Sequence, residues 1–406
     1  MRAVQVKVLA AVAIGTLLAA TARPADLKTL IEKLPAQTKA EAHAIYEGIL
    51  KDAPASLVQL VRMLQPPEKD NDAKVRYALH GLATYVKRPG AEAQRKVFVA
   101  VFLRQLDSDL PASIKGFLIR QLHLAGGSEA IEGIGKRLLD PELSEYAAQA
   151  LLAIGDPAAV AQFRQALPKA KGRVRLTIIQ DLGVLRAARG LDEVRAALGA
   201  KDRELRLTAA FALANSGDEA AVEPLLKAAE VQAPYERSQV VENLLLLARR
   251  LGESGKAKQA ERICRHLLRT RTAEADVHVR CAALLTLAGA LGARAMDDVL
   301  AAMNSKDPDL RKAGIAAAIA MPGEQATQRW VERMKAAEPA GKIAILDLLA
   351  RRGDKAALPP VLGMLQAPDA KVRLAAIEAA ARLGDERAVV PLARRPSGVS
   401  PSGLLW

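Results

Sequence analysis

Aromatic side chains are scarce in this sequence. Phe, Trp and Tyr together make up 3% of the 406 residues, although half of all residues are hydrophobic. A core for this chain must therefore be built from Leu, Ala, Val and Ile. Single-stranded nucleic acids are commonly held by bases stacking on aromatic rings, and few such platforms exist here. Nucleic acid is therefore not expected as a partner, although the net charge of +14 keeps that alternative open.

Cysteine and histidine are also rare, with two and five residues. The Cys-x-x-Cys-His motif is missing, which excludes covalent attachment of a c-type haem. The sequence contains no phosphate-binding loop, dinucleotide fingerprint or nucleophile elbow. We therefore predict no catalytic residue, no bound cofactor, no metal site and a protein that is not an enzyme.

Long hydrophobic runs are absent except at the N-terminus. Val8–Ala20 is uncharged and apolar, follows Arg2 and Lys7, and precedes a small-x-small pattern at residues 20–22. These features are typical of a signal peptide over residues 1–22, and an uncleaved anchor is the alternative. We expect export to the periplasm or the outside of a bacterial cell, a mature net charge of +12, and no transmembrane segment in the mature chain. A charge of that size favours an acidic protein or peptide partner.

A repeat dominates the rest of the chain. The segments 140–156, 202–218 and 369–385 align without a gap, each with an acid at its start, an Ala-rich middle and a closing Gly-Asp. One position in each unit, here called the anchor, recurs at steps of 31 residues within the runs 144–206 and 280–373. The ten anchors are Arg76, Lys115, Ser144, Arg175, Arg206, Val241, Arg280, Arg311, Lys342 and Arg373. A fixed period of this length predicts stacked helical hairpins.

The longer steps between anchors locate insertions. They fall around Lys87–Arg95, Glu230–Glu236 and Arg269–Asp276, and we expect loops between helices there. Pairs such as Asp307-Pro308 combine an N-cap acid with a proline at the first helical position.

The Asp-x-x-Val-Arg core at 369–373 and the closing Leu-Gly-Asp at 383–385 resemble the HEAT repeat family, in particular the short PBS-lyase HEAT-like variety. The resemblance covers about residues 73–392. It implies an all-α fold, a right-handed α-solenoid of about ten stacked two-helix repeats. Residues 23–68 are then atypical N-terminal capping helices, residues 69–395 the solenoid, and residues 396–406 an irregular tail from a truncated end.

Basic anchors form the first candidate surface: Arg76, Arg175, Arg206, Arg280, Arg311 and Arg373. In one interpretation this row binds an acidic partner or phosphates. In the other, which the resemblance supports, each arginine pairs with the turn acid of its own or a neighbouring repeat, namely Asp202, Asp276, Asp307 or Asp369. The four-residue offset between acid and arginine suits such pairing.

Two further features lie close together in the sequence. Arg262, Arg265 and Arg269 share one helix face, either a solvated face or a basic stripe that meets an anionic surface. Cys264 and Cys281 are either two reduced core cysteines or a disulfide, which an oxidising compartment would permit.

Three functions are therefore considered. The first is a non-enzymatic, monomeric scaffold of the bacterial cell envelope that binds protein or peptide. The second is a bilin-lyase-like protein or another enzyme accessory subunit, which the family resemblance suggests. The third is a nucleic-acid-binding HEAT-like protein.

Overall fold

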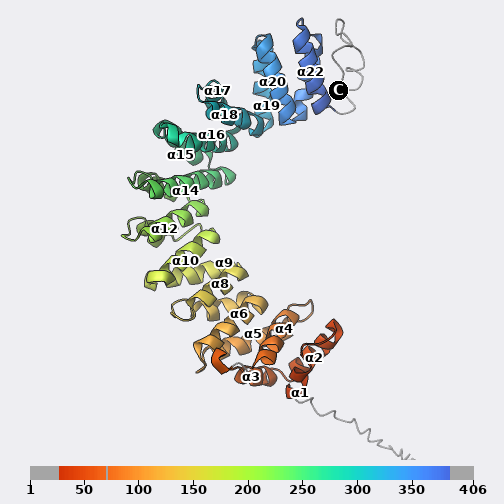
Figure 1. The fold of residues 1–406 in the computed structure, drawn as a ribbon, viewed down its shortest axis with the longest axis vertical. Helices are drawn as coiled ribbons and strands as arrows, with labels where there is room; N and C mark the ends of the chain where they lie inside the picture. Colours follow the sequence, from red (N-terminus) through yellow and green to blue (C-terminus); the bar gives the residue numbers. More distant parts are fainter. Residues whose placement is uncertain (1–26, 70–71, 385–406) are drawn as a thin grey trace, which may run out of the picture. The chain divides into compact units, whose positions relative to one another are not determined.

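The computed structural model describes residues 27–69 and 72–384, which form α-helices and short 3-10 helices without a β-strand (Figure 1). The chain divides into two compact units, Met1–Asp156 (unit 1) and Pro157–Trp406 (unit 2). This boundary falls inside the segment 69–395 that the sequence predicts to be one solenoid. The predicted signal peptide of residues 1–22 and the predicted tail of residues 396–406 lie outside the described residues.

Unit 1 contains four helical hairpins in its described part, each with a first and a second helix. The hairpins are α1 (Leu27–Glu32) with α2 (Lys39–Lys51), α3 (Ala55–Arg62) with α4 (Ala73–Tyr85), α5 (Glu92–Leu106) with α6 (Ala112–Ala125), and α7 (Ile131–Gly135) with α8 (Ser144–Ile154). The segment 23–68, predicted to hold capping helices, contributes α1, α2 and α3.

Unit 2 contains seven hairpins in its described part. They are α9 (Pro157–Ala166) with α10 (Gly172–Val184), α11 (Asp192–Ala197) with α12 (Arg203–Ser216), α13 (Val222–Ala228) with α14 (Pro234–Glu253), α15 (Ala257–Thr270) with α16 (Val277–Leu291), α17 (Met296–Met303) with α18 (Pro308–Ala320), α19 (Glu324–Ala336) with α20 (Pro339–Arg352), and α21 (Leu358–Gly363) with α22 (Ala370–Leu383). The seven anchors of this unit all lie in second helices.

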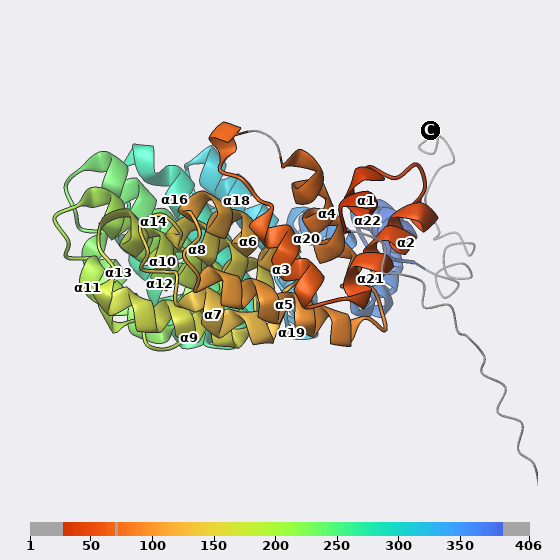
Figure 2. The ribbon, with the colours of Figure 1, turned by 90° about the horizontal axis from the view of Figure 1, so that it is seen from below.

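Successive second helices pack directly on one another, as α10, α12, α14 and α16 do in unit 2. Figure 2 shows α14 and α16 toward one side of the unit and α9 toward the other. Small residues permit this packing. A Cβ atom on Gly183 of α10 would lie 2.7 Å from the Cα atom of Ala212 in α12, so only glycine allows the two helices to approach this closely.

Helix ends are fixed by the residues that the repeat conserves within this chain. The side chains of Asp202, Asp307 and Asp369 accept hydrogen bonds from backbone N–H groups in the first turn of α12, α18 and α22, as N-cap residues do. Gly217 and Gly353 end α12 and α20 in the left-handed conformation, which suits glycine because it lacks a Cβ atom. The predicted fold class, all-α stacked two-helix repeats of a solenoid, is confirmed.

The predicted insertion loops hold in part, because each of the three segments contains a loop between helices and also residues that extend a helix. Helix α5 already begins at Glu92 within the predicted loop Lys87–Arg95, and it is 15 residues long. Helix α15 runs through residue 270 and is 14 residues long, while α13 has 7. Extra residues in a repeat can lengthen a helix by whole turns without disturbing the stack, so they need not form a loop.

One helical stretch, Glu274–Met303, is long and apolar enough by composition to cross a membrane. It is interrupted between α16 and α17 by a 3-10 helix over Gly292–Ala295. In its most apolar window, 56% of the residues are buried inside the structure, as expected for a pair of core helices. Composition alone is therefore weak evidence for a membrane span here.

Candidate binding groove

Five of the anchor arginines donate hydrogen bonds to backbone carbonyls beyond the end of the preceding helix. Arg76 donates to Gln65, and Arg280 donates to Arg271 and Ala273. The other three share one pattern. Arg206 donates through Nη1 to the carbonyl oxygens of Ala200 and Lys201 at 2.7 and 2.9 Å. Arg311 and Arg373 donate to the carbonyls six and five positions before them, at 2.7 to 2.9 Å. Carbonyls near a helix C-terminus lack partners within that helix, so each guanidinium ties the two helices of one hairpin together.

The predicted pairing with the turn acid of the same repeat does not hold for these three arginines. The carboxylates of Asp202, Asp307 and Asp369 are engaged by the backbone N–H groups that they cap. A capping carboxylate points along its own helix, so the arginine one turn later reaches backward to the carbonyls instead.

Two other anchor arginines do pair with acids, and one anchor arginine has no partner among the described residues. Arg76 contacts Asp72, the acid of its own repeat, at 2.8 Å. Arg280 contacts Asp307, the acid of the next repeat, at 3.5 Å. The side chain of Arg175 has no hydrogen bond or ion pair with another described residue. The anchor arginines therefore mainly connect helices within a hairpin and between hairpins, and they do not form a free basic surface.

Arg206 also makes a largely buried ion pair. Its Nε and Nη2 atoms donate to the two carboxylate oxygens of Glu236 at 2.6 and 2.7 Å. The exposed fractions of the two side chains are 26% and 7%. The hydrogen bonds from Arg206 hold the pKa of the Glu236 carboxyl below its usual range, although burial acts in the opposite direction. Glu236 lies on α14, so this pair links two successive repeats.

The predicted basic stripe on α15 is mostly paired. Arg262 contacts Glu223 of α13 at 2.6 Å, and Arg265 contacts Glu261 of its own helix and Asp298 of α17, both at 3.0 Å. Arg269 is exposed and has no ion pair with a described residue. The stripe thus links first helices of three successive repeats.

Both cysteines are free thiols in the structure, so the disulfide alternative for Cys264 and Cys281 is corrected here. Cys264 is buried in α15, and burial raises the pKa of its thiol to about 12. Burial also raises the pKa of the half-buried Cys281 thiol. Within residues 27–69 and 72–384, no three His, Cys, Asp or Glu side chains lie close enough together to hold a metal ion.

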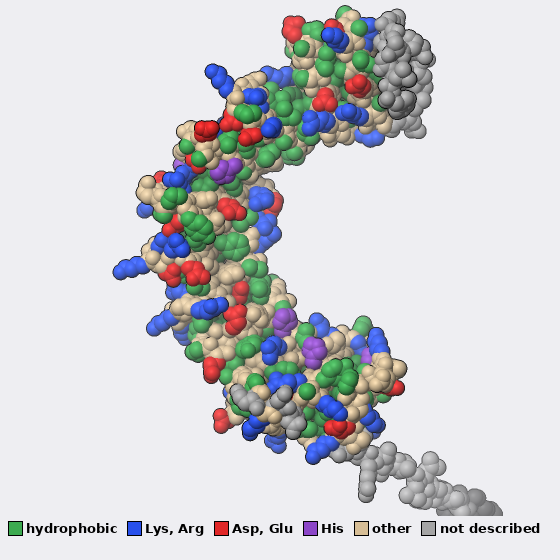
Figure 3. All heavy atoms as spheres, viewed as in Figure 1, with side chains coloured by type: hydrophobic (Ala, Val, Ile, Leu, Met, Phe, Trp, Pro, Cys, Tyr) green, Lys and Arg blue, Asp and Glu red, His purple; other side chains and the backbone are tan. Residues whose placement is uncertain are grey.

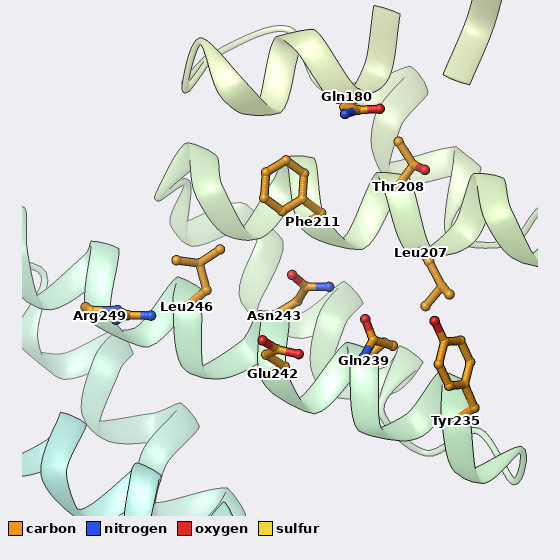
Figure 4. Close-up of a pocket in the computed structure, with 10 residues that line it drawn as sticks. All are labelled: Gln180, Leu207, Thr208, Phe211, Tyr235, Gln239, Glu242, Asn243, Leu246 and Arg249. Atoms are coloured by element: carbon orange, nitrogen blue, oxygen red, sulfur yellow. The ribbon is translucent and has the colours of Figure 1, made fainter. Parts of the chain in front are cut away.

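A groove of about 550 Å³ lies on the second helices of unit 2 (Figure 4). Its residues come from α10, α12 and α14 and combine apolar, amide and charged side chains. The lining residues are Gln180, Leu207, Thr208, Phe211, Tyr235, Gln239, Glu242, Asn243, Leu246 and Arg249. The name "second-helix groove" is used below for this set. Apart from Tyr235, which lies in the predicted insertion Glu230–Glu236, sequence patterns did not single out its members, since each occupies an ordinary repeat position.

An extra helical turn in α14 builds one end of the groove. Second helices α10, α12, α16, α18, α20 and α22 all begin three residues before their anchor, whereas α14 begins seven residues before Val241. Those four additional residues amount to one turn at 3.6 residues per turn. The extra turn carries Tyr235, which lines the groove, and Glu236, which binds Arg206. The segment 230–236, predicted to be a loop, is thus the signal that could have located this site.

Tyr235 is 61% exposed, the largest exposed fraction among the large hydrophobic side chains of the described residues. The guanidinium of Arg203 lies 5.6 Å from the centroid of its ring, a distance at which cation–π attraction is favourable. The ring is therefore held in place while remaining open to contact. Exposed tyrosines of this kind are enriched at protein interfaces.

Two unpaired charges face the groove from α14. Glu242 and Arg249 are both exposed, and neither makes an ion pair or side-chain hydrogen bond with another described residue. They lie seven residues apart, which places them on the same face about 10 Å apart along the helix axis. The groove therefore offers a negative and a positive group at separate points.

A second hollow of about 400 Å³ adjoins the groove and shares Arg249 with it. Its lining comes from α14 and α16 and includes Leu285, which is 41% exposed. Phe211, Leu246 and Leu285 occupy the same position in three successive repeats, five residues after the anchor. The apolar floor of the groove thus continues from α12 across α14 to α16.

A family model described as HEAT repeats matches residues 160–245 and 327–395 of this chain. The first match includes α10, α12 and much of α14, which form the second-helix groove. No match was found among curated proteins.

Several solved structures are similar in part. The Kap95:Nup1 complex matches at 12% identity with a TM-score of 0.46, over 90% of this chain and 59% of that chain. An engineered protein matches at 16% identity and a TM-score of 0.35, over 88% and 98%. Human deoxyhypusine hydroxylase in complex with glycerol matches at 17% identity and a TM-score of 0.28, over 63% and 96%.

The chain spans about half the length of the karyopherin chains it matches, with 59% of the chain in the Kap95:Nup1 complex and 45% of Kap121p. With TM-scores below 0.5, none of these likenesses informs the function of this chain.

Proposed function

We propose, from the HEAT repeats of residues 160–245 and 327–395, that this protein is a non-enzymatic scaffold that binds a segment of another protein in the second-helix groove. The single observation that carries the proposal is the groove itself. Its polar side chains are exposed or half-buried, make no side-chain hydrogen bond with another described residue, and lie beside an apolar floor. A monomer with repeats of the short PBS-lyase variety is the form that we propose for the scaffold.

The lining residues suit an extended polypeptide. The side-chain amides of Gln180, Gln239 and Asn243 can each donate and accept hydrogen bonds, as the N–H and C=O groups of a peptide backbone require. Leu207 and Phe211 offer apolar contact to a side chain between those polar groups. Successive side chains of an extended chain point to opposite sides, so every second side chain can contact this apolar surface.

The two free charges predict a pattern in the bound segment. A peptide in extended conformation advances roughly 3.4 Å per residue, so the distance of about 10 Å between Glu242 and Arg249 along the helix corresponds to about three residues. We expect a Lys or Arg opposite Glu242, an apolar residue in the middle and an Asp or Glu opposite Arg249. This expectation refines the general preference for an acidic partner.

A peptide library with Lys or Arg placed three residues from Asp or Glu tests the proposal. The tightest binder selected on the purified full chain is measured by calorimetry against Glu242→Lys and Arg249→Glu. Both positions are exposed and unpaired, so these variants should fold normally. Each should weaken binding by tenfold or more, because a hydrogen bond to a charged group contributes about 1.5–3 kcal/mol.

The matched control is Lys258→Glu, an exposed charge reversal on the first helix α15. It should leave the affinity unchanged. Equal affinities for the wild type, Glu242→Lys and Arg249→Glu would show that the second-helix groove is not the binding site.

The setting that we propose is the bacterial cell envelope, supported by the signal-peptide pattern of residues 1–22. N-terminal sequencing of the protein from a periplasmic fraction should give Arg23 as the first residue. Recovery of the protein with Met1 from the cytoplasmic fraction alone would contradict export.

A further inference from the structure

The second helices α4 and α6 of unit 1 form a surface without carboxylates. The two helices lie next to each other, and neither contains an Asp or a Glu. Their basic residues are Lys74, Arg76 and His80 on α4 and Lys115, Arg120 and His123 on α6. Such a bias is informative because every other second helix except α16 contains at least one acid.

Only two of these basic residues are already engaged. Lys74 pairs with Glu32 at 2.5 Å, and Arg76 pairs with Asp72 at 2.8 Å. The other four make no side-chain hydrogen bond or ion pair with any described residue. These four are His80, Lys115, Arg120 and His123.

Three of these free basic side chains, His80, Arg120 and His123, lie together with Tyr77 on exposed stripes of the two helices, whereas Lys115 is half-buried. Tyr77 and His80 are three residues apart on α4, and Arg120 and His123 are three residues apart on α6, so each pair shares a helix face. All four are exposed, and Tyr77 has an exposed fraction of 49%. These four residues are called the "basic face" below. Figure 3 shows blue and purple side chains gathered over this part of unit 1.

Arg120 is held in position by an aromatic ring. Its guanidinium lies 5.3 Å from the centroid of Tyr146 on α8, and the ring of Tyr146 in turn packs where Gly116 of α6 has no side chain. The stacking orders the guanidinium and leaves its N–H groups available. A charged group that is already ordered loses little entropy when it binds a ligand.

Acids on the flanking second helices are occupied by other partners. Glu47 of α2 accepts a hydrogen bond from the Tyr85 hydroxyl at 2.7 Å, and Glu145 of α8 accepts one from the Gln149 amide at 3.0 Å. On the first helix α5, Arg95 is paired with Glu129 across repeats. The acids Glu47 and Glu145 are therefore already engaged by other groups, and the basic face itself contains no carboxylate.

We propose that the basic face binds an acidic segment of a partner protein. Carboxylates can accept hydrogen bonds from the guanidinium of Arg120, the imidazoles of His80 and His123 and the hydroxyl of Tyr77. Charge complementarity carries the choice of occupant, because four donors face solvent with no acid among them. The basic face is a second surface, within unit 1, and its existence does not depend on the second-helix groove of unit 2.

A nucleic acid fits the basic face less well than a carboxylate-rich peptide. Proteins that bind DNA through its backbone make roughly 6–10 phosphate contacts, and the two helices offer two permanently charged free side chains, Lys115 and Arg120. Tyr77 alone provides an open ring for stacking, whereas single-stranded nucleic acids usually need several.

The test uses the full chain and a short fluorescent peptide of alternating Glu and Gly residues. The same peptide with Gln in place of Glu is the ligand control, and fluorescence anisotropy measures binding. We expect the Glu peptide to bind at least tenfold more tightly than the Gln peptide. Arg120→Glu on α6 and His80→Glu on α4 should each weaken binding by tenfold or more, because a carboxylate then faces a carboxylate.

Arg104→Glu on the first helix α5 is the matched control, since Arg104 is exposed and has no side-chain partner among the described residues. It should leave binding within about twofold. Circular dichroism confirms that each variant is folded, and the two independent variants on separate helices guard against a local folding defect.

Three results would overturn the inference: equal binding of the Glu and Gln peptides, equal effects of Arg120→Glu and Arg104→Glu, or no effect of His80→Glu. Tighter binding of a single-stranded oligonucleotide of equal charge, lost in Arg120→Glu, would identify the basic face as a nucleic-acid site instead.

Discussion

Replacing Glu236 by Gln should destabilise unit 2 by an amount that the geometry allows us to work out. The carboxylate receives two charge-assisted hydrogen bonds from Arg206, at 2.6 and 2.7 Å. Removing one partner of a fully buried ion pair costs about 3–5 kcal/mol. Arg206 retains a 26% exposed side chain, so water can replace part of the loss, and we expect about 2–3 kcal/mol for Glu236→Gln.

Urea unfolding followed by far-UV circular dichroism measures this change. The matched control is Glu223→Gln, which removes the exposed pair with Arg262, where the two side chains are 63% and 61% exposed. Exposed ion pairs contribute about 0–1 kcal/mol, so Glu223→Gln should shift the free energy of unfolding by roughly 0.5 kcal/mol or less. Equal effects of the two substitutions would refute the claim that Glu236 anchors the extra turn of α14.

The same variant predicts a pH dependence. The pKa of Glu236 is lowered in the folded protein, so its contribution to stability is present above the pKa of an unfolded glutamate, about 4.3. That contribution is lost as the pH falls through the lower folded value. The difference in unfolding free energy between the wild type and Glu236→Gln should be full at neutral pH and should shrink progressively below about pH 4. A difference that stays constant down to pH 2 would contradict the pairing.

Two further predictions concern packing and the thiols. Gly183→Ala should destabilise the protein by about 1–3 kcal/mol, because the new Cβ atom meets the backbone of α12 at 2.7 Å. Gly289→Ala should instead stabilise the protein by roughly 0.5–1 kcal/mol, because nothing lies within 4 Å of the added atom in α16. Thermal melts measure both variants. A change in melting temperature of the same sign for both would refute the close approach of α10 and α12 at Gly183. Titration of the denatured protein should find two reactive thiols, while in the native protein Cys264 should react far more slowly than Cys281; a single or absent thiol would contradict the free cysteines.

The hairpin architecture could be predicted from the sequence because its signals are local. Asp307 and Asp369 start helices through hydrogen bonds to residues two and three positions away, and Gly217 ends one through its own conformation. Such interactions recur in several units, so the 31-residue step of the anchors reports them directly. The position of every anchor on a second helix follows from the same pattern.

The carbonyl partners of Arg206, Arg311 and Arg373 could not be predicted, because a long side chain can reach several acceptors at similar distances, whereas Arg76 and Arg280 do pair with the predicted kind of acid. Arg206 lies one turn after Asp202, yet it binds two carbonyls behind it and Glu236 ahead of it. The choice depends on how the helices of two repeats pack, which the spacing of residues within one repeat does not contain.

The second-helix groove escaped prediction for a related reason. Four inserted residues before Val241 were compatible with a loop or with one more turn of helix, and the structure contains the turn. Pro234, favourable at the first helical position, was the local signal for that turn. The groove then arises because Tyr235 projects beside residues of α10 and α12, which are far away in the sequence.

Photo-cross-linking tests the central claim, that the second-helix groove binds a protein segment, most directly. The tightest-binding peptide from the library carries a benzophenone at its apolar position. It is bound to the full chain and irradiated, and mass spectrometry then locates the adducts. The account predicts adducts on Leu207, Phe211 or Leu246 of α12 and α14, lost in Arg249→Glu. Adducts confined to the first helices α11 and α13, or unchanged in that variant, would contradict it.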